Sequence, residues 1–318
     1  MVVDGDAISG GRLVIRAMEP GDLDAADRVM RVAFGTFVGA TEPSEMFGDM
    51  EYVRPRFAAA PDWAFVAELD GEVVGSNFAT RWGSFASFGP LSIRPDLWDR
   101  GITVALMQPI VELFERWEVR QAGLHTFAQS AKHVGLYQRF DFWPQFLTAI
   151  MTKSIPPAVR DTEFLRFSEL AVETRDVVLT ECAALTNAIF EGLDVRHEIL
   201  SVDNQQLGDT VIVHDGHGVA GLAVCHCGAG EAGSASCYIK FAAHDLEQMP
   251  GPCSSASLRW PSGLQLIEGS VLHPGCVRHR RPSLTTRNER PQPRAEGDSS
   301  LINSWPICGD LLQKAVAT

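Results

Sequence analysis

The order of hydrophobic patterns along this sequence predicts an α/β or α+β protein with a mixed sheet. An alternating strand at 12–16 is followed by helices, three strands, a helix, a strand and a last helix near residue 140. Asp-Gly turns between apolar strands, at 70–71 and 215–216, predict two hairpins. Strands and helices in this order pack as layers around a sheet.

The chain has 318 residues, with 40 acidic and 27 basic side chains and a formal net charge of −13. This length allows two domains, and 45% hydrophobic residues are typical of a globular protein. The negative field predicts no nucleic-acid partner. The sequence contains neither a membrane-length apolar run nor a signal-peptide pattern, so we expect no membrane partner and a cytoplasmic location.

The first elements follow from capping and turn residues. After the strand 12–16, Asp22 is the expected N-cap of a helix that Gly35 is expected to close. The acidic stretch 42–49 predicts a loop and a second helix. The segments on either side of Asp70-Gly71 then predict a hairpin, with strands at 63–69 and 73–85.

A strand-to-helix connection follows at 89–107. Leu91 and Ile93 indicate a strand, and a helix is expected to run on to about Trp117 with a kink at Pro109. A further strand at 122–127 and a short helix at 130–140 complete this part.

Pro156-Pro157 marks a boundary, after which the pattern partly repeats as a helix at 181–193 and strands within 210–243. Two common hairpins are the alternative to a duplicated unit. From about residue 246 the composition changes to a Pro- and Arg-rich tail without apolar periodicity. The predicted domains are a disordered N-terminus 1–11, a first domain 12–155, a second domain 160–245 and a disordered tail 246–318.

All seven cysteines lie at or beyond Cys182, without disulfide or zinc-ribbon spacing. Cys225, His226 and Cys227 could ligate a metal. In a strand, however, the two cysteines share one face and the histidine points to the other, and no second ligand pair follows. The sequence therefore predicts packed thiols in a reducing compartment and no metal.

The turn 100–103 could hold an anion. A helix N-terminus presents free backbone N–H groups and a partial positive charge, and Gly101 allows the backbone to approach a pyrophosphate. An ordinary turn between a strand and a helix is the alternative.

A second motif lies downstream in SAKHVGLYQRFDF (130–142). Together the two motifs resemble the Gcn5-related N-acetyltransferases, or GNAT superfamily, whose pyrophosphate loop reads R/Q-x-x-G-x-G/A and whose later helix reads N-x-x-A-x-x-L-Y-x-K/R-x-G-F. The residues that match are Gly101, Leu136, Tyr137, Arg139 and Phe142, and Arg100 fits a frequent arginine. The positions that depart from the motifs are Trp98, Thr103, Ser130, His133 and Asp141.

The resemblance covers 12–150 and, as a weaker copy, about 163–243. It implies a GNAT acyl-CoA N-acyltransferase fold, with an N-terminal domain and an incomplete second GNAT-like copy. Two such units look like the tandem acetyltransferases, a group that includes the mycothiol synthases. The tail does not resemble the family. A shifted reading frame or a truncation is one explanation, and a natural disordered extension is the other.

The resemblance also implies acetyl-CoA as co-substrate. A strand supplies backbone hydrogen bonds to the pantetheine arm, the loop holds the pyrophosphate, and Tyr137 acts as general acid toward the leaving thiolate. A core tyrosine is the alternative reading of Tyr137. The implied acetyl-CoA contacts are Leu91, Ser92, Ile93, Arg100, Gly101, Ile102, Thr103 and Ser130.

The sequence does not identify the general base. His125 and His133 would titrate usefully, but either could be a structural histidine. Glu42, Glu45 and Glu68 could act through water, although an acidic surface explains them equally well.

The function predicted is acetyl transfer from acetyl-CoA to the amine of a small molecule, an aminoglycoside-like antibiotic or a protein. The alternative is a non-catalytic acyl-CoA-binding or scaffold protein with the same fold.

Overall fold

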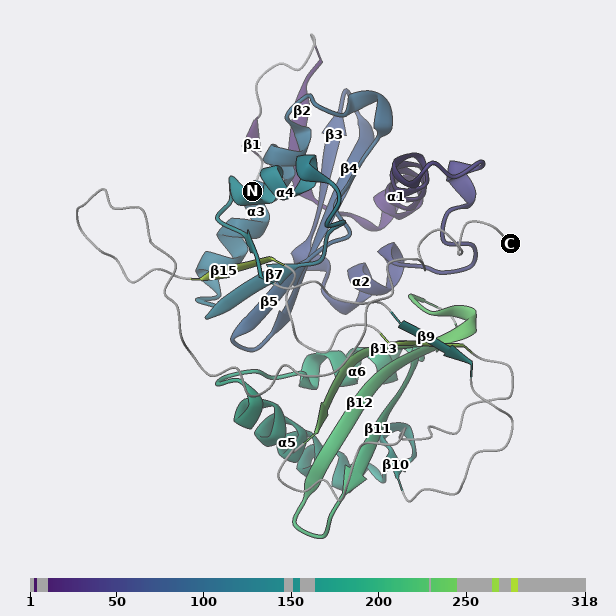
Figure 1. The fold of residues 1–318 in the computed structure, drawn as a ribbon, viewed down its shortest axis with the longest axis vertical. Helices are drawn as coiled ribbons and strands as arrows, with labels where there is room; N and C mark the ends of the chain where they lie inside the picture. The colour runs from purple at the N-terminus through teal and green to yellow at the C-terminus, as the bar shows by residue number, and fades with distance from the viewer. Residues whose placement is uncertain are drawn as a thin grey trace, which may run out of the picture. The chain divides into compact units, whose positions relative to one another are not determined.

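The computed structural model describes residues 3–4, 11–145, 151–154, 164–228, 230–244, 265–268 and 276–279 (Figure 1). The chain divides into two units, 1–278 and 279–318, and only His279 of the second unit is described. Within the first unit the described strands form two mixed sheets. This confirms the predicted α/β mixed-sheet class.

The first sheet has the strand order β1-β2-β3-β4-β5-β7-β15-β8, and β6 pairs with β4 outside this path. Its strands are antiparallel neighbours from β1 to β5, whereas β5 and β7 run parallel. The strands are β1 (Val3–Asp4), β2 (Leu13–Ala17), β3 (Ala64–Leu69), β4 (Glu72–Trp82), β5 (Phe85–Phe88), β6 (Ser92–Ile93), β7 (Gln121–Leu124), β8 (Trp143–Pro144) and β15 (Cys276–His279).

Helices cover both faces of this sheet. Val66 of β3 packs in a cluster with residues of α1 and α2, and its neighbour Ala67 packs with residues of α3. Because successive side chains of a strand point to opposite faces, α1 and α3 lie on opposite faces. The helical elements here are η1 (Pro20–Asp22), α1 (Leu23–Val38), η2 (Pro43–Glu45), α2 (Val53–Ala59), η3 (Pro61–Trp63), η4 (Pro95–Leu97), α3 (Ile102–Arg116) and α4 (Ala131–Gln138).

The two ends of α1 differ from the sequence prediction. Asp22 stands at the N-cap, but its carboxylate binds Arg16 at 2.6 Å and accepts the N–H of Glu19 at 2.8 Å instead of capping α1. Gly35 does not end the helix. Gly39, in the left-handed conformation with φ 75°, closes it one turn later.

Other boundaries also shift. The helix expected within 42–49 is only the 3-10 turn η2, and the α-helix α2 follows it. The strand expected at 73–85 turns back at Gly83 and Ser84, which form the tight connection between β4 and β5. The helix α3 runs on through Pro109. His125 directly follows β7 rather than belonging to it.

The second sheet has the order β10-β11-β12-β13-β14-β9, and its strands β12 and β13 are drawn in green in Figure 1. Apart from the 3-10 turns η2 and η3, which have no counterpart, the series β10, η5, α5, α6, β11, β12, β13 has the same order as β2, η1, α1, α2, β3, β4, β5. In both series the last strand also gains a parallel neighbour, β14 or β7. The elements are β9 (Met151–Ser154), β10 (Leu165–Arg166), η5 (Phe167–Glu169), α5 (Val172–Ile189), α6 (Arg196–Gln205), β11 (Gly208–His214), β12 (Val219–Gly228), β13 (Gly233–His244) and β14 (Gln265–Glu268).

The two segments predicted to be disordered contain short strands where they are described: β1 within 1–11, and β14 and β15 within 246–318. The prediction of disorder otherwise concerns residues outside the described ranges. Among the described helices, none has the length and apolarity that a membrane span requires.

The contact of α1 with η2 gives a first prediction. A Cβ added at Gly35 would lie 2.5 Å from the Cα and the carbonyl oxygen of Pro43. In Gly35→Ala the backbone must therefore shift, and we expect a loss of about 1–3 kcal/mol in the free energy of unfolding by urea denaturation. Gly135→Ala is the matched control, because a Cβ in α4 meets nothing within 4 Å and should stabilise its helix by roughly 0.5–1 kcal/mol. Equal gains in the two variants would refute the contact.

Candidate active site

The first sheet separates into two branches next to β4. Near its end β4 pairs with β5, through Ala79 and Phe88, and near its start it pairs with β6, through Ser76 and Ser92. The parallel pairing of β5 with β7 extends as far as Ser87. In the described part of the chain β6 has no partner other than β4. One edge of β6 is therefore left open toward the end of β7.

A cavity of about 820 Å³ lies at this branch point. One wall is the segment 88–93 and another is the segment 124–127. The helix α1 contributes Phe34 and Phe37, whereas the start of α3 contributes Gly101 and Thr103. Since α1 and α3 cover opposite faces of the sheet, the cavity is lined from both faces.

The α3 wall has the features of an anion site. Gly101 is the N-cap of α3 with φ 81°, and a Cβ added to it would meet no atom within 4 Å. The free N–H groups of a first helical turn favour an anion in front of them. The indole of Trp98 holds the preceding turn by donating its Nε1–H to the carbonyl of Ile93 at 2.8 Å.

An ion pair lies beside this turn. Asp99 carries a negative charge in the loop itself, where it would repel an anion. Its carboxylate binds Nζ of Lys132 at 2.7 Å, and the same ammonium lies 5.7 Å from the ring centroid of Trp98. Lys132 thus offsets the charge of Asp99.

The helix α4 places two side chains of interest in the cavity. Tyr137 is 7% exposed, and its ring contacts Phe88 edge-on with centroids 5.7 Å apart. His133 precedes it by four residues and therefore lies on the same helical face. The hydroxyl of Ser130 accepts the N–H of His133 at 3.4 Å, which caps the helix.

The α1 wall of the cavity is aromatic. The ring of Phe37 lies 4.9 Å from Phe127 and 4.8 Å from the imidazole of His133, between centroids. Burial lowers the pKa of His125, and burial together with the charge of Lys132 lowers that of His133. The neutral imidazole is therefore favoured in both side chains near pH 7.

The structure brings together most of the residues singled out from the sequence. Arg100, Ile102 and Ser130 do not line the cavity: Ile102 is packed in the core and Ser130 caps α4. Those that line it are Leu91, Ser92, Ile93, Gly101, Thr103 and Tyr137.

The carboxylates considered as bases lie elsewhere. Glu42, Glu45 and Glu68 are absent from the cavity lining, and Glu68 binds Arg16 at 2.8 Å.

The sequence did not predict the aromatic and charged side chains that line this cavity. Phe37 and Phe127 are far apart in the chain, and only the fold brings them together. The departure of the helix motif at His133 was the one available signal. At this position the imidazole of His133 lines the cavity.

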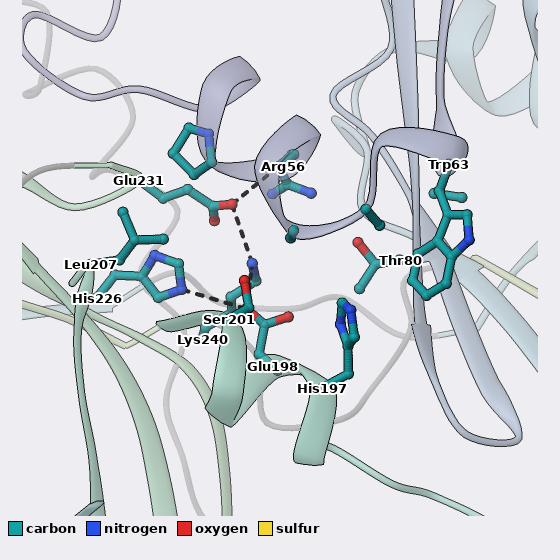
Figure 2. A pocket seen from close by; sticks show the side chains of 14 residues that line it. Arg56, Trp63, Thr80, His197, Glu198, Ser201, Leu207, His226, Glu231 and Lys240 are labelled. Carbon is teal, nitrogen blue, oxygen red and sulfur yellow. Dashed lines mark hydrogen bonds and ion pairs between the residues drawn. The ribbon is translucent and has the colours of Figure 1, made fainter. Parts of the chain in front are cut away.

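A second, much smaller cavity of about 20 Å³ lies in a buried group of charges (Figure 2). Nζ of Lys240 is 2.9 Å from Glu198 and 3.3 Å from Glu231, and Nε of Arg56 is 3.1 Å from Glu231. Nε2 of His226 lies 3.6 Å from Glu198. A volume of this size holds no more than about one water molecule, so it cannot accept a substrate.

This charge network joins α2 and β4 to α6 and the hairpin of β12 and β13. Indole Nε1–H of Trp82 donates to Glu198 at 3.2 Å. Lys240 is the extra residue at a register shift between β12 and β13, and such a bulge redirects a side chain. Burial opposes ionisation of Glu198, but Lys240 and His226 outweigh it, and the pKa of Glu198 is lowered. The network therefore has a structural role.

Among the described residues, no group of three or more His, Cys, Asp or Glu side chains is arranged to hold a metal ion. The side chains of Cys225 and Cys227 pack on one face of their sheet and His226 on the other, as the sequence predicts.

The comparisons with known proteins agree with this geometry. Residues 32–142 match the model of the Acetyltransferase (GNAT) family. The match covers less than half of the chain, and it shows that residues 32–142 are similar to a GNAT acetyltransferase domain. The resemblance seen in the loop and helix motifs is confirmed for this domain. No curated protein matched the chain.

Several solved structures are similar to this chain, and the first of the three named here supports the same fold. A putative acetyltransferase from Pyrococcus horikoshii is 16% identical, with 71% of this chain and 69% of that chain covered and a TM-score of 0.51. A GNAT family acetyltransferase from Brucella melitensis, solved in complex with acetyl-CoA, is 22% identical over 41% of this chain and 82% of its own, with a TM-score of 0.31. A GCN5-related N-acetyltransferase from Kribbella flavida is 12% identical over 74% of this chain and 58% of its own, with a TM-score of 0.44.

The charge network gives a second prediction. In Glu198→Gln the ammonium of Lys240 loses a buried partner, so we expect a loss of roughly 3–5 kcal/mol in the free energy of unfolding at pH 7. Because the folded pKa of Glu198 is depressed below its ordinary value of 4.5, its stabilisation is present above that pH and is lost as the pH falls. The difference between variant and wild type should therefore shrink when urea denaturation is repeated below pH 4.5.

Glu72→Gln is the control, because this carboxylate pairs with Arg94 at the surface, where its side chain is 74% exposed. It should change the free energy by no more than about 1 kcal/mol. A Glu198→Gln variant as stable as this control would contradict a structural role for the network.

Proposed function

We propose that the domain 12–155 transfers an acetyl group from acetyl-CoA to an amine. The observation that carries this proposal is the cavity at the branch point of β5 and β6, lined from both faces of the sheet. A donor and an acceptor can then approach the same point from opposite faces, which aligns the reacting atoms.

The residues present fit acetyl-CoA. The open space at Gly101 and the start of α3 suit a pyrophosphate, with Lys132 offsetting the charge of Asp99. Leu91, Ser92 and Ile93 would bind the pantetheine arm along the open edge of β6. The cavity volume lies within the range of cofactor sites. When bound, acetyl-CoA supplies an activated thioester.

The reaction also requires two proton transfers, one to the leaving thiolate and one from the acceptor amine, and side chains of this protein would carry them out. The phenol of Tyr137 donates a proton to the sulfur of the leaving thiolate. The acceptor amine must lose a proton before or during transfer. Of the described lining residues, His125 and His133 carry the neutral imidazoles that can accept it.

The proposed acceptor is a small-molecule or protein amine, in the cytoplasm, and the proposal includes no metal, nucleic acid or membrane. The aromatic wall at Phe34, Phe37 and Phe127 lies on the α1 face, opposite the α3 anion site. We assign the acceptor to this face.

We further propose that residues 160–245 are an incomplete second GNAT-like copy, as in tandem acetyltransferases. The shared order of strands and α-helices from β10 to β13 and the parallel neighbour β14 support it. The position that corresponds to α3, between β13 and β14, lies outside the described residues.

The loop assignment gives a third prediction. Gly101→Glu places a negative charge at the anion site, and Gly101→Gln is its control with the same bulk and the same strained φ. We expect calorimetry to show coenzyme A binding at least ~10-fold weaker in the Glu variant than in the Gln variant, since about 1.4 kcal/mol of repulsion produces this factor. Equal affinities of the two variants would reject the loop as the pyrophosphate site.

The role of Tyr137 gives a fourth prediction and tests the function itself. Tyr137→Phe removes the proton donor and keeps the ring that contacts Phe88. Steady-state acetylation of a panel of amines should be roughly 10²–10⁴-fold slower, with coenzyme A affinity nearly unchanged. Tyr52→Phe is the control, because this buried phenol lies outside the cavity lining and should leave turnover unaltered.

The same experiment separates an enzyme from a binding protein. Unchanged turnover in Tyr137→Phe would remove this residue from the mechanism. Wild-type protein that binds coenzyme A tightly and acetylates no amine in the panel would instead establish the non-catalytic acyl-CoA-binding protein.

A further inference from the structure

Three thiols gather on one face of the second sheet. Cys225 and Cys227 are two residues apart in β12, so their side chains share a face, and Cys237 of the neighbouring strand β13 joins them. The same face holds Val211 and Ile239. Neither the cavity at the branch point nor the charge network uses these sulfur atoms.

The strand register places two of the three sulfurs in position to bond. Cys227 lies directly opposite Cys237, and its thiol donates a hydrogen bond to Sγ of Cys237 at 2.9 Å. Directly opposed residues of antiparallel strands have Cα atoms about 4.5–5.5 Å apart, within the range of about 4.4–6.8 Å that a disulfide accepts.

The third thiol is a less suitable partner. Cys225 is opposite Ile239, and it is therefore only diagonal to Cys237. A diagonal pair is about 7–8 Å apart, beyond the usual disulfide range.

The thiols are also unequal in acidity. The neighbouring thiols of Cys225 and Cys227 lower the pKa of the Cys237 thiol, against the opposing effect of burial. The hydrogen bond with Cys237, together with burial, raises the pKa of Cys227. Cys237 is therefore the thiolate of the group, and a thiolate is the nucleophile in sulfur chemistry. Cys237 is buried, whereas Cys227 is partly exposed.

We propose that Cys227 and Cys237 are a redox-active pair that a small hydroperoxide oxidises to a disulfide. The Cys237 thiolate attacks one peroxide oxygen, the O–O bond breaks, and with one proton taken up the products are a sulfenic acid and water. The Cys227 sulfur then bonds to the Cys237 sulfur and displaces the hydroxyl group as a second water. In sum, two thiols and one hydrogen peroxide give one disulfide and two water molecules.

This bond would close the hairpin that carries Glu231. The carbonyl of Gly230 accepts the N–H of Glu51 at 2.8 Å, and Asp49 accepts the N–H of Ser234 at 2.9 Å. The oxidised pair would thus clip the hairpin next to its tip, which contacts the residues before α2.

The test uses the full chain and hydrogen peroxide. After treatment, free thiols are alkylated and all seven cysteines are mapped by peptide mass spectrometry. We expect a Cys227–Cys237 bridge that dithiothreitol reverses. It should form at least ~10-fold faster than any oxidation of Cys182, because burial raises the pKa of that thiol to about 12.

Two variants distinguish this pair from incidental oxidation. In Cys227→Ser no bridge to Cys237 should form, and Cys237 should remain as the sulfenic acid that a dimedone probe captures. In Cys225→Ala the bridge should still form, because Cys225 is opposite Ile239 and only diagonal to Cys237. Circular dichroism verifies that both variants are folded.

The wild-type map alone decides the proposal. Absence of the Cys227–Cys237 bridge, a bridge from Cys237 to another cysteine, or oxidation no faster than that of Cys182 would overturn it. This outcome is independent of acetyl transfer, because none of the three thiols lines the cavity at the branch point.

Discussion

The pairing of the long strand β4 with two separate strands is the constraint on which the proposed site depends. Its end pairs with β5 and its start with β6, and Gly89 and Pro90 interrupt the strand between them. The parallel neighbour β7 pairs with β5 only as far as Ser87. Backbone groups at the open edge of β6 need partners, and a bound molecule can supply them. The cavity follows directly from this divergence.

The two helices on opposite faces give the cavity its two different walls. On the α3 wall, Gly101 leaves space in front of a helix N-terminus, and Lys132 offsets the charge of Asp99 in the loop. On the α1 wall, the ring of Phe37 contacts both the ring of Phe127 and the imidazole of His133. One wall suits an anion and the other suits an uncharged organic group, which is the division that transfer between two substrates requires.

The second sheet carries polar chemistry of a different kind. Side chains alternate along β12, so the thiols of Cys225 and Cys227 lie on one face while His226 belongs to the charge network on the other. The register shift at Lys240 directs an ammonium between Glu198 and Glu231. Because those charges are buried, they require one another, and the network restricts how α2, α6 and the hairpin can be arranged.

The sequence by itself determined the features that depend on neighbours along the chain. The alternation in 64–69, the Asp70-Gly71 turn, the helix start at Gly101 and the shared face of Cys225 and Cys227 all follow from local periodicity and turn chemistry. The order of strand and helix patterns predicted the mixed sheet, and the motifs at Gly101 and Tyr137 predicted the similarity to the GNAT family.

Other features could be decided only by the tertiary structure, because they depend on residues distant in the chain. Gly35 looked like a helix end, but the contact with Pro43 explains a glycine there, and α1 continues past it. The sequence predicted Asp22 as a helix cap, but its carboxylate binds the guanidinium of Arg16 instead. The aromatic wall, the partner of Asp99 and the pairing of Cys227 with Cys237 arise where strands and helices meet in space. Local periodicity carries no information about such contacts, since only packing brings these side chains within reach of each other.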